Sequence, residues 1–522
     1  METARTRILA RCGSHETVVV RRALILLAFI CVPLPSGGCD RAALPPKSEP
    51  ANTLQITPGD APGSLGAAPG NPGARNLVGS HTTRVSTGCT LYVKPTGSNG
   101  KSGRTLADAL RTPNRAVSLV KPGDVVCFGP GTYPPLNVAD VHGTAAAPVV
   151  FRALSGGNGD ATFTSNTLSD GASVFVTRSD YIHVYDLRLA ESLIGIGFFG
   201  STNGRIEGLR VESIGQAAIH VGGQNTADGS ERFLGTPSHD VDVIGNTIRD
   251  TGKVKARSGE GVYVGTGGVG GDDTHDIFVA YNTIEDVRAE GIEVKAYTYN
   301  AIVRGNVVSH GSHFFHAAIT VAVTPRGCAA DPASPIPPAA ESSAAPASRC
   351  TAPADYREGN YLVEDNLVFA YTTAARPAGI GYGGPVAGIG IGHGNTIVRN
   401  NLVWDIPGGN GIQTYTTFGN PAARRVQLED NTVWNPSGRA IALHEGDEGT
   451  GVTDQLGDVT LAGNVTNDGS AGSAMVQASQ FVGPVTGRAD AGAGPGGGFR
   501  RVETAHQVSE GSHGPVPGER QP

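Results

Sequence analysis

The sequence predicts an all-β protein folded as a parallel β-helix, a solenoid in which every coil adds a strand to each of the same few sheets. The first observation is a recurring segment with an asparagine near its end, as in SHDVDVIGNTI (238–248), THDIFVAYNTI (274–284) and GNTIVRNNLV (394–403). The second is a short, β-branched element of period two that alternates with it, as in GVYVG, GIEVK and GIQTY. Short repeats of this kind without a helical pattern are typical of a β-solenoid.

The asparagines form the clearest column of the repeat. Asparagine tolerates the left-handed backbone conformation of a tight turn, and stacked asparagine side chains can hydrogen-bond along a solenoid axis. We therefore predict a structural ladder that needs no functional explanation. Its members are Asn246, Asn282, Asn306, Asn366, Asn401, Asn431 and Asn464.

The composition agrees with a turn-rich β architecture. Glycine accounts for 75 of the 522 residues, about double the roughly 7% of an average protein. Charged residues make up 17%, below the usual roughly 25%. The net charge of −7 gives no electrostatic reason to expect nucleic acid or an anionic membrane surface as a partner.

The N-terminus predicts export. Arg21 and Arg22 precede ALILLAFICV, which is too short to span a bilayer and fits the apolar part of a signal peptide, residues 1–38. The PSGGCD that follows is similar to the signal of bacterial lipoproteins, which implies that cleavage leaves Cys39 as a lipidated first residue. The usual leucine three places earlier is Ser36 here, so ordinary secretion remains the alternative. We expect a monomer that is secreted or lies at the cell envelope, touching a membrane only through a lipid anchor.

The chain is expected to divide into one folded domain and flanking segments. Residues 39–86 are rich in Pro, Ala, Gly and Ser and predict a disordered tether, residues 87–470 predict the β-helix, and residues 471–522 predict a low-complexity tail. An insertion at 309–358 interrupts the repeat. Export favours disulfides, and the cysteines after Cys39 allow the neighbouring pairs Cys89–Cys127 and Cys328–Cys350, although the sequence leaves the pairing open.

One segment resembles a known family. LYVKPTGSNGKSGRTLADALRTPNRAVSLVKPGDVVCFGPGTY (91–133) is similar to the entry segment of secreted right-handed parallel β-helix proteins of the pectate-lyase-like superfamily. There, a first strand and a capping helix precede a PGD–hydrophobic–GTY turn. With the coils, the resemblance covers about residues 90–470. It implies a right-handed β-helix with a short N-terminal cap, in a group that contains polysaccharide lyases, epimerases and hydrolases, most often acting on uronic-acid polymers.

Stacking the second element coil on coil gathers ionisable side chains on three adjacent coils. With Val262 and Ile292 facing inward, Tyr263 and Glu293 face outward in one column. The residues with candidate catalytic roles are Lys295, Glu293, Tyr263 and Glu290, and the candidate substrate contacts on the same face are His220, Glu260, Thr320, Gln413 and Tyr415.

The resemblance implies a cleft along this strand face and abstraction of the proton α to a uronate carboxylate. That reaction needs a base and a positive charge that neutralises the substrate carboxylate. Lys295 is the best-placed base and Tyr263 the second. A carboxylate at Glu293 should raise the pKa of Lys295 and weaken it as a base, unless a metal ion binds Glu290 and Glu293. The alternative is a surface Glu–Lys pair that contributes under about 1 kcal/mol.

Two further segments contain potential ligands. GGDDTHD (270–276) offers Asp272 and Asp273 as hard oxygen ligands for Ca²⁺, and its spacing is similar to a DDxxD cluster of some pectate lyases. In that family, however, the cluster lies on the strand that reads EGIEVK here. HGSHFFH (310–316) favours an ordinary surface role for its histidines, although a loop lining the cleft could recruit one as an acid or base.

The leading hypothesis is therefore a lyase, or an epimerase with the same proton abstraction, whose partner is an acidic polysaccharide. A glycoside hydrolase is the nearest alternative, because Glu260 and Glu290 stack at about 5 Å, close to the carboxyl spacing of retaining enzymes. A non-catalytic lipoprotein that binds polysaccharide on its surface is the alternative from another class.

Overall fold

We analysed a computed structural model of the protein. It describes residues 81–85, 88–155, 160–224, 236–254, 259–265, 273–295, 298–313, 317–323, 359–374, 386–392, 395–414, 426–435, 437–443, 459–470 and 474–475. All of them belong to one compact unit, Gln55–Pro522. Within these ranges, no helix is long and apolar enough to cross a membrane. The predicted signal peptide with Cys39 lies outside the described residues, as do Asp272, Cys328, Cys350 and Tyr415.

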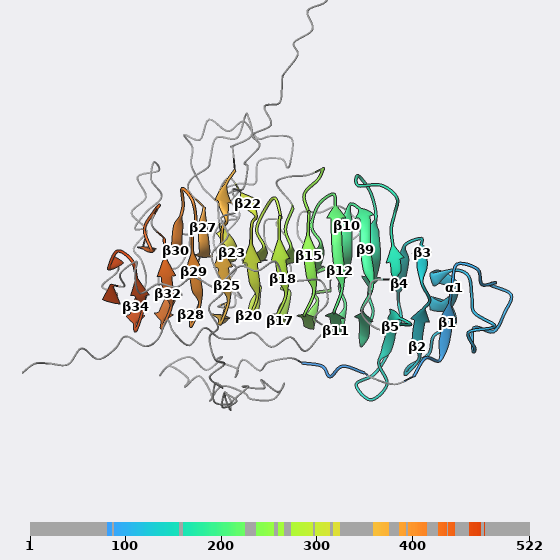
Figure 1. Ribbon diagram of the computed structural model, residues 1–522. Helices are drawn as coiled ribbons and strands as arrows, with labels where there is room; N and C mark the ends of the chain where they lie inside the picture. The colour runs from blue at the N-terminus through green and yellow to red at the C-terminus, as the bar shows by residue number, and fades with distance from the viewer. Residues whose placement is uncertain are drawn as a thin grey trace, which may run out of the picture. The chain divides into compact units, whose positions relative to one another are not determined.

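The fold is an all-β right-handed parallel β-helix built from three long parallel sheets (Figure 1). In hydrogen-bonded order, sheet 1 contains β1 (Leu91–Val93), β2 (Val125–Phe128), β5 (Val149–Ala153), β8 (Ile182–Tyr185), β11 (Thr202–Glu207), β14 (His239–Ile244), β17 (His275–Ala280), β20 (Tyr299–Arg304), β24 (Tyr361–Glu364), β28 (Thr396–Arg399), β31 (Val426–Glu429) and β34 (Val459–Ala462).

Each coil continues from sheet 1 into sheet 2 and then into sheet 3. Sheet 2 contains β3 (Gly131–Tyr133), β6 (Ala161–Phe163), β9 (Arg188–Ser192), β12 (Arg210–Ile214), β15 (Thr247–Arg249), β18 (Thr283–Glu285), β21 (Val307–Ser309), β25 (Leu367–Phe369), β29 (Leu402–Trp404), β32 (Thr432–Trp434), β35 (Val465–Thr466) and β36 (Ala474–Met475). Sheet 3 contains β4 (Leu136–Ala139), β7 (Ala172–Thr177), β10 (Ile194–Phe199), β13 (Ile219–Gly222), β16 (Val262–Val264), β19 (Ile292–Lys295), β23 (Ala317–Val323), β27 (Ala387–Ile391), β30 (Asn410–Thr414) and β33 (Ile441–Leu443).

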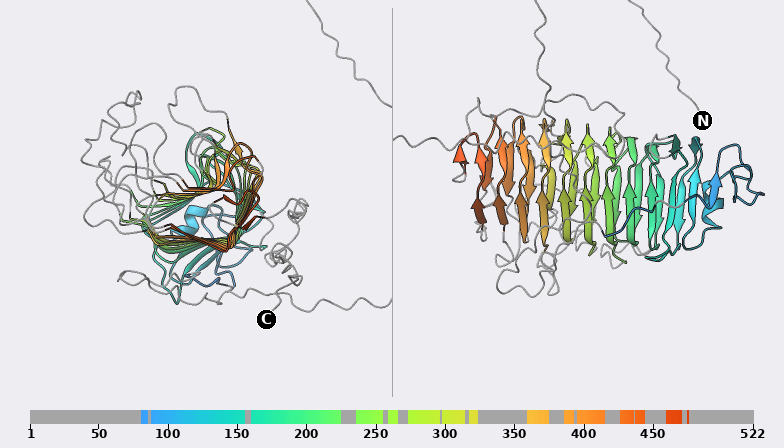
Figure 2. Two further views of the ribbon diagram at one scale, coloured as in Figure 1. Left: turned by 90° about the vertical axis from the view of Figure 1, so that its left-hand side faces the viewer. Right: turned by 60° about the horizontal axis from the view of Figure 1, so that its bottom comes forward.

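Apolar residues at every second strand position fill the space between the sheets. In sheet 3, Val262 pairs with Ile292 and Ile292 with Ile319, and none of the three side chains is exposed. The predicted inward register is therefore confirmed on these coils. Seen end-on, the strands of each sheet lie behind one another around this common core (Figure 2).

A short helix provides the predicted cap. α1 (Pro113–Val117) has a proline in its first turn, where the missing N–H is harmless, and it buries Pro113 and Ala116. Ala116 belongs to the same apolar core as Leu91 of β1. A disulfide joins Cys89, just before β1, to Cys127 of β2. This bond confirms one of the two neighbouring cysteine pairs.

The asparagine ladder lies at the corner between sheets 1 and 2. The Nδ2 of Asn282 donates to Oδ1 of Asn306 at 2.9 Å and to the carbonyl of Val243 at 3.0 Å, and the Oδ1 of Asn306 also accepts from the backbone N–H of Asn282 at 3.0 Å. The structural role is confirmed, but the expected left-handed asparagines are wrong. The residue before each asparagine turns instead, as at Gly245 (φ 62°) and Tyr281 (φ 58°), which leaves the asparagine side chain directed along the stack.

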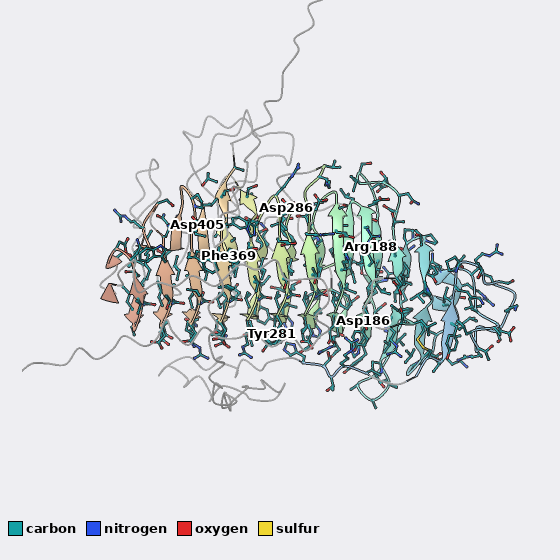
Figure 3. The ribbon with its side chains drawn as sticks, viewed as in Figure 1. Asp186, Arg188, Tyr281, Asp286, Phe369 and Asp405 are labelled. Carbon is teal, nitrogen blue, oxygen red and sulfur yellow. A yellow bond between two sulfur atoms is a disulfide. The ribbon has the colours of Figure 1, made fainter. Side chains whose placement is uncertain are left out.

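The corner after sheet 2 also turns through left-handed residues. Asp286 follows β18 with φ 54°, and Asp405 follows β29 with φ 52° (Figure 3). Aspartate is one of the few residues besides glycine that enters this region readily. The predicted insertion, 309–358, contains β22 (Ser312–His313), which pairs with β26 (Thr372–Thr373), and also β23; residues 324–358 lie outside the described part of the chain.

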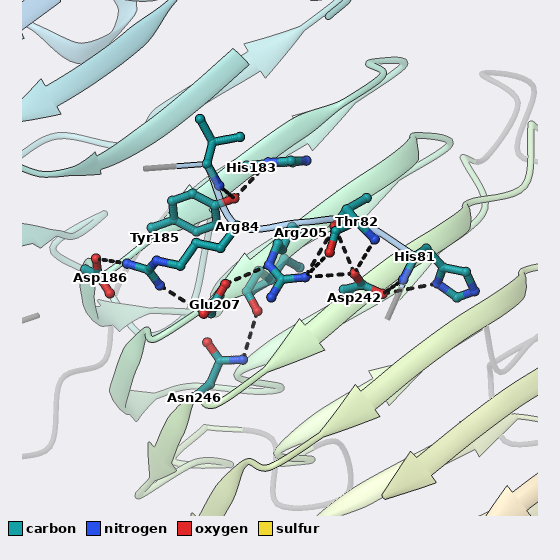
Figure 4. A network of polar contacts seen from close by, with 12 residues as sticks. His81, Thr82, Arg84, His183, Tyr185, Asp186, Arg205, Glu207, Asp242 and Asn246 are labelled. Carbon is teal, nitrogen blue, oxygen red and sulfur yellow. Dashed lines mark hydrogen bonds and ion pairs between the residues drawn. The ribbon is translucent and has the colours of Figure 1, made fainter. Parts of the chain in front are cut away.

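The last residues of the predicted tether are bound to sheet 1. We call residues 81–85 the N-terminal strap (Figure 4). Asp242 of β14, whose side chain is fully buried, accepts hydrogen bonds from the backbone N–H of His81 and Thr82, each at 3.0 Å. Arg84 forms ion pairs with Asp186 and Glu207. The strap therefore crosses several strands through charged contacts.

Candidate active site

The outward column of sheet 3 has the predicted register. His220 pairs with Tyr263, Tyr263 with Glu293, and Glu293 with Thr320. The column continues through Gly390 to Gln413. Lys295, two residues after Glu293, belongs to a second outward column. Regular stacking would place it opposite Ala322, but an irregularity after Val294 places it opposite Val323.

The side chains of this column point away from the core, but not all of them are exposed to solvent. His220 and Tyr263 are half-buried, but Glu293 is only 2% exposed, Thr320 is fully buried and Gln413 is 6% exposed. The outward column is therefore buried from β19 onward. Period-two alternation separates the inside of a coil from its outside, but it carries no information about whether the outside is covered.

Three buried carboxyl groups meet beside this column. Glu260 lies just before β16 and Glu290 just before β19, and their exposed fractions are 4% and 2%. The two coils stack directly, with the N–H of Gly261 donating to the carbonyl of Glu290 at 3.0 Å. A Cβ at Gly261 would lie 2.5 Å from the carbonyl oxygen of Gly291, so glycine permits this close approach. One oxygen each from Glu260, Glu290 and Glu293 lies within 4.8 Å of the other two.

One ammonium group faces these carboxylates. The Nζ of Lys295 forms a short ion pair with Oε1 of Glu293 and lies 5.1 Å from the ring centroid of Tyr263. Its side chain is 15% exposed. Lys295 and Tyr263 therefore join the acidic cluster, and the surface-pair alternative is wrong because Glu293 is buried and Lys295 is largely covered. Removing one partner of a buried ion pair strongly destabilises the fold, since the other charge would be left without compensation.

Burial sets the proton affinities of the site. Burial, and then the charges of Glu293 and Glu290, raise the pKa of Glu260 well above its usual range. Burial and the charge of Glu290 raise the pKa of Glu293 to about 7, although Lys295 opposes this.

The pKa values of Lys295 and Tyr263 are also raised. Burial alone would lower the pKa of Lys295, but the charge of Glu293 and its neighbours outweighs burial and raises it. Burial raises the pKa of the Tyr263 hydroxyl far above its ordinary value. Lys295 is consequently an ammonium and Tyr263 a neutral phenol near neutral pH. The sequence-based objection to Lys295 as a base is thus supported.

Two residues near the cluster were not among the predicted site residues. His313 of β22, expected at the surface, is 1% exposed, and its Nδ1 lies 3.9 Å from Oε1 of Glu290. The hydroxyl of Tyr371 donates to the carbonyl of Ala289, and burial raises its pKa well above the usual range. The histidine-rich HGSHFFH was the available signal for His313. Tyr371 stands in no recognisable pattern, because its position depends on where β25 ends.

The remaining predicted residues take peripheral positions. His220 Nε2 lies 3.1 Å from the carbonyl of Gly265, and its ring contacts Tyr263 at 4.5 Å. Thr320 Oγ1 interacts within its own strand with Ala317. Gln413 Oε1 accepts from Asn410 at 2.8 Å. Asp273 is not part of the close acidic group; among the described residues, that group consists of the three glutamates.

The three glutamates also form the place where a cation could bind. Carboxylate oxygens are the ligands that Ca²⁺ prefers, and Ca²⁺ takes six to eight of them in a flexible arrangement. Three carboxyl groups within 4.8 Å of one another would supply part of this set. The donor type therefore fits Ca²⁺ at the glutamates, whereas the predicted ligand pair Asp272 and Asp273 stays a prediction because Asp272 lies outside the described residues.

Comparisons with known proteins find distant similarities to solved structures. No protein-family model matches the chain, and no curated protein matches it significantly. The alginate lyase from Paenibacillus sp. str. FPU-7 is similar at 17% identity and TM-score 0.39, covering 64% of this chain and 96% of that chain. Pectate lyase Pel9A is similar at 13% identity and TM-score 0.44, covering 82% and 91%. A structure described as a glycoside hydrolase is similar at 9% identity and TM-score 0.48, covering 75% and 99%. At these identities the likeness concerns the fold alone.

Proposed function

We propose that the protein is an enzyme that acts on an acidic, uronate-containing polysaccharide by abstracting the proton α to a uronate carboxylate, as a lyase or an epimerase. The observation that carries the proposal is the cluster of buried carboxyl groups with raised pKa values around one buried ammonium. Strongly shifted proton affinities concentrate at functional sites.

The raised pKa values of Lys295, Glu293 and Glu260 favour other catalytic roles than those predicted from the sequence. Lys295 stays protonated and supplies the positive charge that faces the substrate carboxylate, in contrast to its predicted role as the base. Glu293, with a pKa of about 7, is suited to act as the base near neutral pH, since a general base works best when its pKa lies near the operating pH. Glu260, which burial keeps protonated, is suited to act as the acid.

The reaction balances with these groups alone. Glu293 takes the proton from C5 of the uronate, and the electron pair left behind forms the C4–C5 double bond. The bond from C4 to the glycosidic oxygen breaks, and that oxygen receives the proton of Glu260. Lys295 stabilises the negative charge that develops on the carboxylate in the transition state. For an epimerase, no bond to oxygen breaks, and Glu260 gives its proton to C5 from the face opposite to Glu293.

Glycoside hydrolysis is the second candidate, and one observation favours it. An acid and a nucleophile about 5 Å apart are typical of retaining hydrolases, and the carboxyl oxygens of Glu260, Glu290 and Glu293 approach one another within 4.8 Å. In that case Glu260 would protonate the leaving oxygen and Glu290 or Glu293 would attack the sugar. This candidate needs no uronate in the substrate.

As an alternative to these roles, we propose that Ca²⁺ binds the acidic cluster; independently of that, we propose that the protein is exported. Ca²⁺ at the glutamates would add positive charge for a uronate carboxylate, and the glutamates would then be its ligands and not the base and the acid. Its binding is tested by a rise in melting temperature on adding CaCl₂ and by loss of that rise in Glu290→Gln. Export, either by secretion or with Cys39 lipidated at the envelope, is supported by the signal-like N-terminus and by the Cys89–Cys127 bond, because structural disulfides persist in oxidising compartments.

The function is tested by product analysis on a panel of uronate polymers. A lyase produces an unsaturated uronate with ultraviolet absorbance, an epimerase exchanges the C5 proton in D₂O without cleavage, and a hydrolase produces saturated reducing ends. Glu293→Gln should lower turnover by roughly 10² to 10⁴, the usual contribution of a positioned base, and Glu285→Gln on β18 of sheet 2 serves as the matched control. Full activity of Glu293→Gln, with the control also active, would remove Glu293 from the reaction.

A further inference from the structure

Aromatic side chains follow the open part of sheet 3 toward the acidic cluster. Phe175 of β7 and Phe199 of β10 have ring centroids 5.5 Å apart, and Phe199 lies 4.7 Å from the ring of His220. His220 in turn lies 4.5 Å from Tyr263, which contacts Lys295. We call Phe175, Phe199, His220 and Tyr263 the aromatic strip. It covers four consecutive coils, β7, β10, β13 and β16, and ends at the acidic cluster.

The strip lies outside the core. Phe175 is 38% exposed and Phe199 is half-buried, and neither belongs to an apolar core cluster of the described residues. A glycine makes the arrangement possible: a Cβ at Gly197 would lie 2.5 Å from Cε2 of Phe199 and 3.2 Å from Cδ2 of Phe175. The two phenyl rings therefore lean over the strand position that has no side chain. Core packing does not account for placing two phenyl rings on this outer face.

The open and covered parts of sheet 3 meet at the acidic cluster. The outward column is half-buried at His220 and Tyr263, and it becomes buried at Glu293 and Thr320. Among the described residues, the column is more open toward β16, β13, β10 and β7, so a chain that brings one residue to Glu293 and Lys295 can extend over the face in that direction. That direction is the one the aromatic strip occupies.

We propose that the aromatic strip binds consecutive sugar rings of the polysaccharide on one side of the reacting residue, through the apolar faces of those rings. This inference rests on the proposed function. Neighbouring strands of a sheet generally lie about 4.7–4.9 Å apart, which is close to the length of one pyranose residue, so successive sugars lie on successive coils. Aromatic faces carry partial negative charge and attract the C–H groups of a sugar face.

The strip also defines what the enzyme recognises. Phenyl rings offer no hydrogen bond and no charge to a carboxylate, whereas Lys295 at the end of the strip offers an ammonium. The uronate carboxylate is therefore required at the reacting position, and the sugars over Phe175 and Phe199 are selected by an accessible apolar face and not by charge. A polymer in which uronates alternate with neutral sugars fits this arrangement.

The experiment compares long and short probes on the full chain. Hexasaccharides and disaccharides of polygalacturonate and of alginate, and a neutral hexasaccharide of cellulose, are titrated calorimetrically into wild type, Phe175→Ala, Phe199→Ala and Gly197→Ala. Each variant should weaken hexasaccharide binding about fivefold, the equivalent of about 1 kcal/mol for one aromatic contact, and change disaccharide binding less than twofold. Leu106→Ala, which removes an apolar side chain that is 46% exposed elsewhere, should change neither.

The outcomes separate this proposal from the proposed function. Unchanged hexasaccharide binding in the correctly folded Phe175→Ala and Phe199→Ala variants overturns the aromatic strip, even if Glu293→Gln abolishes turnover. Cellohexaose binding that depends on Phe175 supports the strip, even if no uronate polymer is converted. Wild type that binds none of the hexasaccharides also overturns the strip. Melting temperatures within the range of the Leu106→Ala control show that a loss of binding is not a loss of fold.

Discussion

Glu293 and Lys295 form an ion pair two residues apart, in which Glu293 is buried and the Lys295 side chain is 15% exposed. Because Glu260 and Glu290 add two more carboxyl groups, the cluster contains more acids than the single ammonium can neutralise. The protein resolves this excess by retaining protons, and burial raises the pKa of Glu293 to about 7. The reactivity of the site is therefore a property of the group and not of any one residue.

Removing the charge of Glu290 should make Glu293 more acidic. The charge of Glu290 is the second cause, after burial, of the raised pKa of Glu293. In Glu290→Gln, which keeps the shape of the side chain, the pKa of Glu293 should fall below about 7. The rising limb of the rate–pH profile should therefore move to lower pH by about one unit. Profiles of kcat/KM for wild type, Glu290→Gln and the control Glu285→Gln measure it. A limb that stays in place would show that Glu293 is not the titrating base.

At the scale of elements, the N-terminal strap is the part whose attachment depends on ionisation. Asp242 is fully buried and accepts from Thr82 Oγ1 at 2.8 Å and from Arg205 Nη1 at 3.1 Å, in addition to the strap backbone (Figure 4). Its Oδ1 lies 3.1 Å from Nδ1 of His81. One buried carboxylate thus holds the strap against β14.

Protonation of His81 should strengthen the strap. Burial lowers the pKa of His81, but the hydrogen bond and charge of Asp242 outweigh burial, so the folded pKa is raised above 6.5. A raised pKa means that the stabilisation is complete below the unfolded value and is lost as pH rises through the folded value. The difference in unfolding free energy between wild type and His81→Gln, about 1.5–3 kcal/mol for a charged hydrogen bond, should therefore be larger at pH 6 than at pH 8.5.

Urea unfolding of both proteins at the two pH values measures this difference. Asn99→Gln, far from the strap in the β1–α1 loop, is the control and should respond equally at both pH values. A His81→Gln penalty that grows with pH would contradict the assigned direction of the shift.

At the scale of the whole molecule, the repeat made the β-helix predictable, and the parts without a repeat were not. The alternation of Val262, Ile292 and Ile319 gave the inward register, because every coil buries the same positions. The irregularity that sets Lys295 opposite Val323 interrupts a single strand and leaves no trace in the pattern. The positions of His313 and Tyr371 depend on β22 and β25 of neighbouring coils, so only the folded chain brings them to Glu290 and Ala289.

The asparagine ladder should stabilise the stack unequally along its length. Asn306 exchanges side-chain hydrogen bonds with Asn282 and Asn366 and donates to the carbonyl of Val279. Asn464 is the last rung and has a ladder partner on one side, Asn431. Asn306→Ala should cost more than Asn464→Ala, by about 1–3 kcal/mol for each additional buried group left unpaired. Chemical unfolding measures both, and equal costs would contradict a cooperative ladder.

The Cys89–Cys127 disulfide should stabilise the N-terminal end of the stack, because it joins the segment before β1 to β2. The end strand β1 pairs with β2 alone among the strands of its sheet, and its other edge has only the short bridge from Val93 to Leu110, so the first coil has less pairing than the inner coils. In a solenoid, stability is roughly a sum over neighbouring repeats, and an end repeat opens first. Cys89–Cys127 spans 38 residues, and closing a loop of that length contributes about 3–4 kcal/mol by the chain-entropy estimate.

Cys89→Ser with Cys127→Ser should therefore expose the first coil before the rest of the stack unfolds. Hydrogen exchange should accelerate in β1, α1 and β2 and stay unchanged in β14 and β17, which lie far along sheet 1. The reduced wild-type protein provides the matched comparison, since it lacks the bond but keeps both side chains. Faster exchange throughout the stack would mean that the coils unfold as one cooperative unit, and unchanged exchange in β1 would show that its pairing with β2 and the packing of α1 hold the end without the bond.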